Sequence, residues 1–213
     1  MSYLKRQNVP KNWPVPRKGT PYVAKPNSLG IPVVIVLRDM LDVAQNKKEV
    51  TKALYNKLIL LNNKIVIDKN KGVGLFDVLT LVPEKKSYRM VLNDKGKFAL
   101  EEITGNSVDK KIAKIVDKKT LKGKKTQLNL SDGRNLLSQV KCGTNDSIVV
   151  DFKNKKIEKI LGFKEKAKVL VIAGKHAGEK GEIVKINEKM KMIEIKKGNE
   201  NVNVLIKQII IVE

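Results

Sequence analysis

The sequence has very few residues from which a metal site or a disulfide could be built. Among its 213 residues there is one cysteine, Cys142, and one histidine, His176. A disulfide within the chain needs a second cysteine, and a structural zinc site usually needs about four cysteine or histidine ligands. The composition therefore predicts neither a disulfide nor a bound metal or cofactor, and it is compatible with a reducing cytoplasm.

Long hydrophobic runs and aromatic residues are also scarce. The longest apolar stretch, Ile31 to Leu37, falls far short of the roughly 20 residues that a membrane-spanning helix needs. The N-terminus runs straight into charge at Lys5 and Arg6, so we expect a soluble chain that stays in the cytoplasm and has no membrane partner. With 4% aromatic residues, two or three small domains are expected in place of one large core.

Acidic residues are half as numerous as basic ones. Lys and Arg total 44 and Asp and Glu total 22, which gives a formal net charge of +22 and a pI near 9.9. Such a surplus makes a compact chain repel itself, and a polyanion that binds the chain relieves the repulsion. The sequence has no basic amphipathic helix or lipidation motif that would favour a membrane surface. The charge therefore predicts binding to nucleic acid.

The first segment, residues 1–31, is predicted to be a basic, proline-rich extended arm. Five prolines fall between Pro10 and Pro26, and no acidic residue occurs before Asp39. Proline lacks an amide donor and disfavours helix before it, so we expect no regular element here, and order only on a partner surface. Trp13 could stack on an unpaired base or fill a groove of its own protein, and the same two alternatives apply to Tyr3 and Tyr22.

Residues 32–80 are predicted to form a small α/β RNA-binding domain. Apolar residues at helical spacing indicate a helix over 32–44, with Pro32 in its first turn. Asn46 followed three residues later by Glu49 has the form of a capping box and predicts a second, short helix. Asn62-Asn63 then separates two apolar runs and favours a tight hairpin turn. The predicted unit is helix, helix, hairpin.

The rest of the chain alternates short apolar runs with turn sequences. We expect a central β domain over 81–165 and a small five-stranded barrel over 166–213, so the fold class is α+β, mostly β. The loop between Gly174 and Gly181 is rich in glycine but lacks the Gly-Lys-Ser/Thr ending of a phosphate-binding loop. We predict a tight turn close to RNA there, with no nucleotide site.

Contact with RNA phosphates needs cations held on rigid elements, because these contacts supply much of the affinity and fix the orientation. Residues 110–125 hold eight lysines and one acid, and this run can equally contact phosphates or form a solvated face. The predicted RNA-binding residues are Lys5, Arg6, Lys11, Trp13, Arg17, Lys18, Arg38, Lys47, Lys48, Lys52, Lys57, Lys64, Lys122, Lys124, Lys125, Lys175, His176 and Lys180.

Five short motifs in a fixed order carry a resemblance to a known family. They are Leu4-Lys5-Arg6 with Pro10-Lys11-Asn12-Trp13, then Leu37-Arg38-Asp39, Lys64-Ile65-Val66-Ile67-Asp68, Gly74-Leu75-Phe76-Asp77-Val78 and Asp94-Lys95-Gly96-Lys97-Phe98. Together they resemble the ribosomal protein family S4e of archaea and eukaryotes over essentially the whole chain. The end at Glu213 is earlier than in eukaryotic relatives and favours the archaeal type.

The resemblance implies a module order and a role. It implies that the barrel over 166–213 is an SH3-like KOW module, to which Lys168 to Gly174 is similar. It also implies a structural constituent of the small ribosomal subunit, with ribosomal RNA and neighbouring ribosomal proteins as partners. The surface of the two helices and the hairpin would then lie against folded ribosomal RNA.

Two other functions stay open at this point. A transcription elongation factor or an RNA chaperone could also carry a KOW module, and some RNA-modifying enzymes carry a similar helix and hairpin unit. The sequence shows no nucleophile with a neighbouring base and no glycine-rich cofactor turn after a strand. It therefore predicts a protein that is not an enzyme and has no small-molecule substrate.

Overall fold

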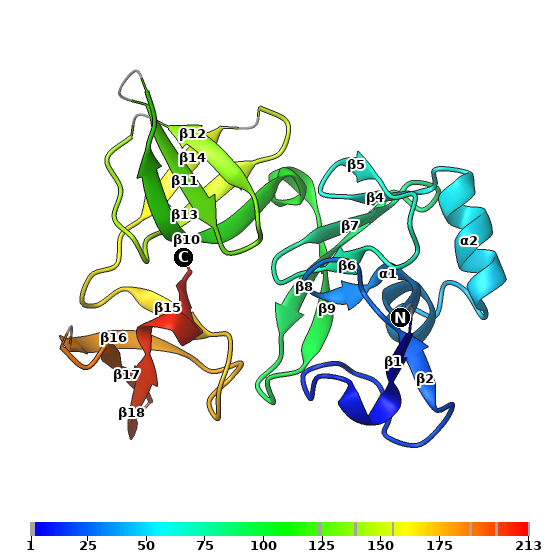
Figure 1. Cartoon of the computed structure of the whole chain (residues 1–213), viewed down its shortest axis with the longest axis horizontal. Coiled ribbons are helices and arrows are strands. Elements are labelled where there is room, and N and C mark those ends of the chain that lie inside the picture. Colours follow the sequence, from blue (N-terminus) through cyan, green and yellow to red (C-terminus); the bar gives the residue numbers. More distant parts are fainter. Residues whose placement is uncertain are drawn as a thin grey trace. The chain divides into compact units, whose positions relative to one another are not determined.

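The computed structural model describes residues 3–122, 125–138, 140–154, 156–187, 189–198 and 200–212. The fold is mostly β with few helices, as expected (Figure 1). The chain divides into two compact units. The N-terminal unit comprises Met1–Asn93 and Lys97–Asp109, and the C-terminal unit comprises Asp94–Gly96 and Lys110–Glu213.

The basic first segment contains regular structure, which corrects the expectation of an arm without any. Strand β1 (Tyr3–Lys5) pairs antiparallel with β2 (Tyr22–Ala24), and a 3₁₀ turn (Arg6–Asn8) follows β1. Trp13 and Val23 are buried in the hydrophobic cluster of the N-terminal unit. The prolines do exclude α-helix, but these apolar side chains bury enough surface to hold the segment in extended form.

The first predicted helix is shorter than expected and has a different form. A short strand, β3 (Ile31–Pro32), pairs with β6 (Gly72–Val73) and leads into α1 (Val33–Ile35), which continues as a π-helical turn (Val36–Met40). The backbone N–H of Leu41 donates to Val36 O at 3.0 Å, a bond over five residues, and Asp42 then adopts φ +52°. A left-handed residue cannot continue a right-handed helix, so the expected end at residue 44 is wrong.

The second predicted helix is confirmed as α2 (Lys47–Tyr55). Asn46 Oδ1 accepts hydrogen bonds from the backbone N–H groups of Lys48 (2.9 Å) and Glu49 (3.1 Å). The Glu49 carboxylate accepts in return from the side chain of Asn46 and from the backbone N–H of Gln45. The cap therefore satisfies helical N–H groups that have no partner within the helix.

The predicted hairpin is confirmed and belongs to a larger antiparallel sheet. Asn62 and Asn63 adopt φ +51° and +60°, as a tight primed turn requires. The sheet has the order β5-β4-β7-β8-β9 and continues past residue 80, where the sequence placed a domain boundary. Its strands are β4 (Ile59–Leu61), β5 (Lys64–Ile65), β7 (Val78–Leu81), β8 (Lys86–Leu92) and β9 (Phe98–Ile103), followed by a 3₁₀ turn (Gly105–Asp109).

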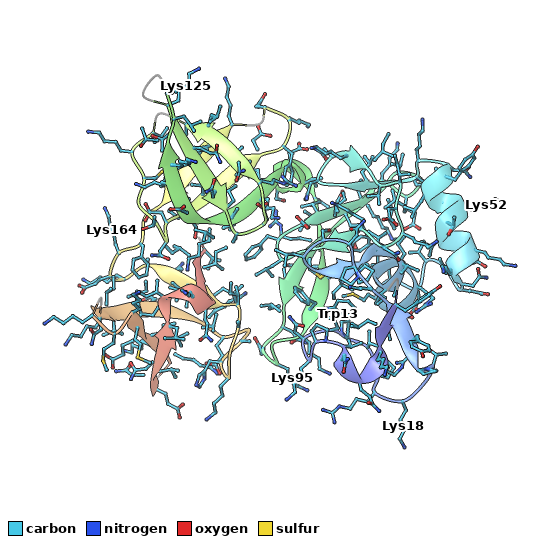
Figure 2. The ribbon with its side chains drawn as sticks, in the orientation of Figure 1. Trp13, Lys18, Lys52, Lys95, Lys125 and Lys164 are labelled. Carbon is cyan, nitrogen blue, oxygen red and sulfur yellow. The ribbon has the colours of Figure 1, made fainter. Side chains whose placement is uncertain are left out.

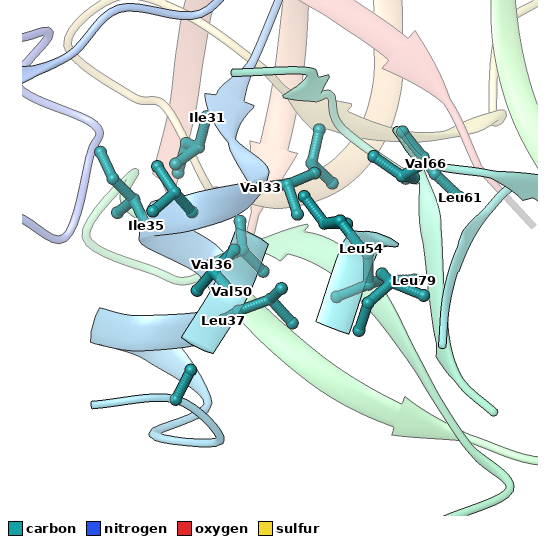
Figure 3. Close-up of a cluster of buried hydrophobic side chains, with 14 of the residues drawn as sticks. Ile31, Val33, Ile35, Val36, Leu37, Val50, Leu54, Leu61, Val66 and Leu79 are labelled. Carbon is teal, nitrogen blue, oxygen red and sulfur yellow. The ribbon is translucent and has the colours of Figure 1, made fainter. Parts of the chain in front are cut away.

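The core of the N-terminal unit lies where the helices meet this sheet (Figure 3). Residues 33–37 are all buried, because α1 and its continuation are enclosed by other elements. Val50 and Leu54 of α2 point into the same cluster as Leu61 and Leu79 of the sheet. This packing fixes the orientation of α2 and therefore of its outer face.

The C-terminal unit contains two five-stranded antiparallel sheets, each with its own core. The central sheet has the order β12-β11-β10-β13-β14, with β10 (Lys110–Thr120), β11 (Thr126–Leu130), β12 (Asn135–Ser138), β13 (Ser147–Asp151) and β14 (Ile157–Leu161). The last sheet has the order β18-β17-β16-β15-β19, with β15 (Lys168–Val171), β16 (Lys180–Asn187), β17 (Met192–Lys197), β18 (Glu200–Leu205), a 3₁₀ turn (Ile206–Gln208) and β19 (Ile209–Ile211).

Two buried polar side chains of the central sheet bond to the last sheet. The ammonium group of Lys114 donates to the carbonyl oxygens of Ile206 and Ile209, the second at 3.0 Å. Ser147, which is fully buried, accepts from the backbone N–H of Ile211 at 3.0 Å. Burial lowers the pKa of Lys114 to about 8, because a buried site disfavours the charged form.

Candidate nucleic-acid interface

Helix α2 presents three predicted RNA-binding lysines. Lys47, Lys48 and Lys52 are exposed, and Lys48 and Lys52, four residues apart, lie on the face opposite the buried Val50 and Leu54. Figure 2 shows Lys52 projecting from α2. The separation follows from the helical period, which places residues three and four apart on one side. The buried face anchors the helix, so these three cations project from a rigid element.

Two further predicted lysines lie just beyond α2. Lys57 is exposed and left-handed, with φ +58°, and its backbone N–H donates to Leu54 O at 3.0 Å to close the helix. Lys64 is exposed at the start of β5, directly after the hairpin turn. The helix and the hairpin thus both carry predicted cations on the surface of the N-terminal unit.

The first segment contributes four more exposed cations. Lys5, Lys11, Arg17 and Lys18 are all exposed, and Lys18 projects from the loop before β2 (Figures 1 and 2). Because β1 and β2 pair and Trp13 is buried, this loop is held at both ends. The segment therefore presents its charge from a folded scaffold.

Two predicted arginines are engaged within the protein. Arg6 donates to Thr20 O at 2.6 Å, to Pro16 O at 2.5 Å and to Thr20 Oγ1 at 3.0 Å, so its guanidinium closes the loop before β2. Arg38 binds the Asp39 carboxylate through two hydrogen bonds of 2.8 Å, and this contact raises the pKa of Arg38. Both guanidinium groups therefore bind partners within the protein and stabilise its local structure.

The three aromatic residues of the first segment have different environments. Trp13 is 5% exposed and packs in the core, so its indole fills a groove of its own protein. Tyr3 and Tyr22 are 55% and 59% exposed, with ring centroids 6.4 Å apart. The ammonium group of Lys47 lies 5.8 Å from the centroid of the Tyr3 ring, within the range of a cation–π contact.

A cavity of about 630 Å³ opens between these tyrosines and the start of α1. It brings together residues from the first segment, the α1 region, the start of α2 and the loop before β6. Its lining residues are Tyr3, Arg6, Pro14, Val15, Pro16, Thr20, Tyr22, Val23, Ala24, Val34, Arg38, Asp39, Asp42, Lys47, Lys69 and Asn70.

Sequence reasoning missed Lys69 and Asn70 at this site. Lys69 is brought there by a backbone hydrogen bond from Val34 N–H to Lys69 O at 3.1 Å, next to the pairing of β3 with β6. That contact joins segments about 35 residues apart, and no periodicity within either segment indicates it.

The predicted cations of the C-terminal unit lie in two loops. Lys122 and Lys125 are exposed between β10 and β11, and Lys124 lies outside the described residues. Lys175 is exposed between β15 and β16, and Lys180 is exposed at the start of β16. His176 is half-buried in that same loop, with its Nδ1 3.1 Å from Glu179 Oε2.

Glu179 binds Lys197 as well as His176. Lys197 Nζ lies 2.9 Å from Glu179 Oε1, and this hydrogen bond is the main cause that lowers the pKa of Glu179. His176 therefore has a partner inside the loop, which the sequence prediction of an RNA contact did not foresee.

The lysine run over residues 110–125 does not form a uniformly solvated face. Lys111 and Lys114 of β10 are buried, whereas Lys118 and Lys119 are exposed. Lys111 Nζ lies 3.0 Å from Asp132 Oδ2. Burial alone would raise the pKa of Asp132, but its contacts with Lys111 and Arg134 outweigh that and lower it.

The described residues give little support for a metal site, a membrane-spanning helix or a reactive cysteine. Among the residues that the structure describes, no group of three or more His, Cys, Asp or Glu side chains is arranged to hold a metal ion. Within the same residues, no helix combines the length and apolar character that crossing a membrane requires. Burial raises the pKa of the Cys142 thiol, which makes it a weak nucleophile.

Comparison with known proteins gives consistent matches. The model of ribosomal family S4e matches residues 84–157, and that of the KOW motif matches residues 165–207. Small ribosomal subunit protein eS4 of Methanocella arvoryzae is 37% identical over 191 residues, which cover 87% of this chain and 81% of the relative. The protein of the same name from Haloarcula marismortui is 33% identical over 97% of this chain and 88% of its own length.

A solved structure is similar along most of its length. It is the crystal structure of the 30S ribosomal protein S4e from Thermoplasma acidophilum, with a TM-score of 0.73 and 26% sequence identity. The match covers 85% of this chain and 94% of that chain.

Proposed function

This chain belongs to ribosomal family S4e and is a structural constituent of the small ribosomal subunit, and we propose that it stabilises folded ribosomal RNA mainly through contacts between Lys or Arg side chains and phosphates. The family is one of ribosomal proteins and not of enzymes. Association with the ribosome and its RNA follows from membership. The proposal also includes the residues that make contact, the neighbouring proteins, the cytoplasmic location and the lack of catalysis.

The observation that carries the proposal is the exposed basic face of α2 and the hairpin. A buried apolar face anchors α2, and its outer lysines are held where a phosphate backbone could lie against them. Because the backbone of a packed helix is already ordered, little backbone conformational entropy is lost on binding, and each phosphate contact releases condensed counterions from the RNA.

The proposed contact residues are the exposed cations of both units. They are Lys5, Lys11, Arg17, Lys18, Lys47, Lys48, Lys52, Lys57 and Lys64 in the N-terminal unit, and Lys122, Lys125, Lys175 and Lys180 in the C-terminal unit. Arg6, Arg38 and His176 are also proposed to contact RNA, because their internal bonds leave some of their donors unused. The four functional segments, 1–31, 32–80, 81–165 and 166–213, likewise stay a prediction.

Sedimentation of a cell lysate tests the ribosomal role. The chain should travel with small subunits through a gradient at moderate salt, and a variant with Lys48, Lys52 and Lys64 changed to Gln should shift toward the light fractions. Recovery of the unaltered chain only in light fractions would favour an elongation factor or RNA chaperone. Incubation with ribosomal RNA should leave all bases unmodified, which separates the proposal from an RNA-modifying enzyme.

A further inference from the structure

The cavity of the N-terminal unit combines exposed aromatic rings with positive charge. In the pairing of β1 with β2, Tyr3 lies opposite Ala24 and Lys5 opposite Tyr22, so the two tyrosines are diagonal neighbours on one face. Their rings are inclined at 55°, which means that they do not stack on each other. A flat partner could therefore stack against a tyrosine ring at the cavity.

The charge of the lining is predominantly positive. Four cations, Arg6, Arg38, Lys47 and Lys69, face two acids, Asp39 and Asp42. Arg38 and Asp39 neutralise each other in a two-bond pair. Lys47 and Lys69 have no carboxylate within ion-pair distance among the residues that the structure describes.

The lining also holds groups that could bind the edge of a base. Asp42 is exposed on a left-handed backbone, and Asn70 carries an amide that can donate and accept. A volume of about 630 Å³ lies within the range of roughly 300–1,000 Å³ that small-ligand sites have. The cavity thus offers an aromatic platform, two ammonium groups and hydrogen-bonding side chains in a space of suitable size.

We propose that this cavity receives one unpaired nucleotide of RNA, with its base against Tyr22 and its phosphate beside Lys47 and Lys69. Unpaired bases are splayed out of RNA and stack on aromatic rings, whereas paired bases have both faces covered within the helix. Lys47 lies over Tyr3, which makes Tyr22 the main stacking surface. The inference rests on the proposed function. The phosphate contacts are indifferent to sequence, and the cavity adds a preference for RNA with a bulge or loop.

Two RNA hairpins and the full chain test the proposal. One hairpin carries a single bulged adenosine, and the other is the same hairpin without it. By fluorescence anisotropy, the chain should bind the bulged hairpin about tenfold more tightly, in line with the loss per stacked base on removing an aromatic ring. Tyr22→Ala should abolish most of this ratio while leaving the affinity for the paired hairpin nearly unchanged.

Matched variants separate stacking from other effects. Tyr22→Phe keeps the aromatic ring and should keep the ratio. Tyr55→Ala removes a ring that is 86% exposed and lies outside the cavity, so it too should keep the ratio. Thermal unfolding of each variant should match that of the parent chain, because Tyr22 and Tyr55 are both largely exposed.

The outcomes are distinguishable. Equal affinity for both hairpins, with binding that still weakens steeply as salt rises, overturns the nucleotide site and leaves the proposed function standing. No binding to either hairpin at low salt overturns both. A ratio that survives Tyr22→Ala also overturns the nucleotide site. The same holds if an acidic peptide occupies the cavity by itself and displaces both hairpins equally.

Discussion

At the scale of single residues, a buried carboxylate ties the hairpin turn to the rest of its sheet. Asp77 is 7% exposed and accepts hydrogen bonds from Asn62 Nδ2 at 2.7 Å and from the backbone N–H of Gly74 at 2.6 Å. Asn62 Oδ1 in turn accepts from the backbone N–H of Val78 at 2.9 Å. The turn that precedes the exposed Lys64 is therefore held by the hydrogen bonds that link Asn62 to Asp77 and Val78.

Removing that carboxylate should destabilise the N-terminal unit. Asp77→Ala leaves one buried and one part-buried donor without their acceptor, and each such donor costs about 1–3 kcal/mol, so we expect a loss of roughly 3 kcal/mol. Urea unfolding followed by the fluorescence of Trp13, the one tryptophan, measures it. Asp68→Ala, at an exposed turn, is the control and should cost about 1 kcal/mol or less. Equal losses in the two variants would contradict the assignment.

A second prediction at this scale concerns the pH dependence of the C-terminal unit. The pKa of Lys114 is about 8 in the folded chain, below the value of roughly 10.4 expected when unfolded. Between these values the unfolded chain binds more protons, so the free energy of unfolding should rise as the pH increases from about 8 to 10. Lys114→Met should lack this rise.

Unfolding free energies from circular dichroism at several pH values give the comparison for Lys114. The informative quantity is the difference between parent and variant, because other lysines titrate in the same range and cancel. Parallel pH profiles would show that the Lys114 ammonium is not held in a desolvated site. Well below pH 8 both states are protonated, and the difference should be constant.

At the scale of elements, the cap of α2 sets the start of the helix that carries three proposed contact residues. Asn46→Ala removes the acceptor for two helical N–H groups and should cost about 1 kcal/mol. Asn46→Ser keeps a capping oxygen and should cost only a few tenths of a kcal/mol. Trp13 fluorescence during urea unfolding measures both variants. If they lost equal stability, the side-chain cap would not be the cause.

The comparison of α1 with α2 shows what the sequence could and could not predict. The start of α2 was predictable because Asn46 and Glu49 act locally, and the hairpin because two adjacent asparagines tolerate positive φ. The apolar spacing over 32–44 also fitted a helix, but it could not reveal the π-helical turn or the left-handed Asp42. Those features depend on packing against segments distant in the sequence.

The candidate site divides in the same way. Exposure of Lys48 and Lys52 follows from the helical period, so the sequence was sufficient for this face. The internal bonds of Arg6 and the burial of Trp13 required the pairing of β1 with β2, which a proline-rich segment does not indicate. Sequence reasoning therefore misassigned, or left open, the residues whose role depends on tertiary contacts.

At the scale of the whole molecule, the net charge of +22 predicts a strong dependence of RNA affinity on salt. Deleting residues 1–26 is a poor test of this dependence, because Trp13 and Val23 belong to the core and their loss would disrupt the fold. Neutral substitutions of exposed lysines preserve the packing. They also count contacts, because each phosphate contact contributes a known increment to the slope.

Changing Lys48, Lys52 and Lys64 to Gln should therefore reduce the slope of log affinity against log salt by roughly 2 to 3, at about 0.7–0.9 per lost contact. The control changes to Gln the lysines Lys164, Lys166 and Lys185, which are also exposed in the C-terminal unit but lie outside the proposed contact set. Both variants lose three positive charges, so a general effect of net charge would change the two slopes alike. A smaller slope only in the first variant would mean that phosphates lie against α2 and the hairpin, whereas equal slopes would remove this face from the proposed interface.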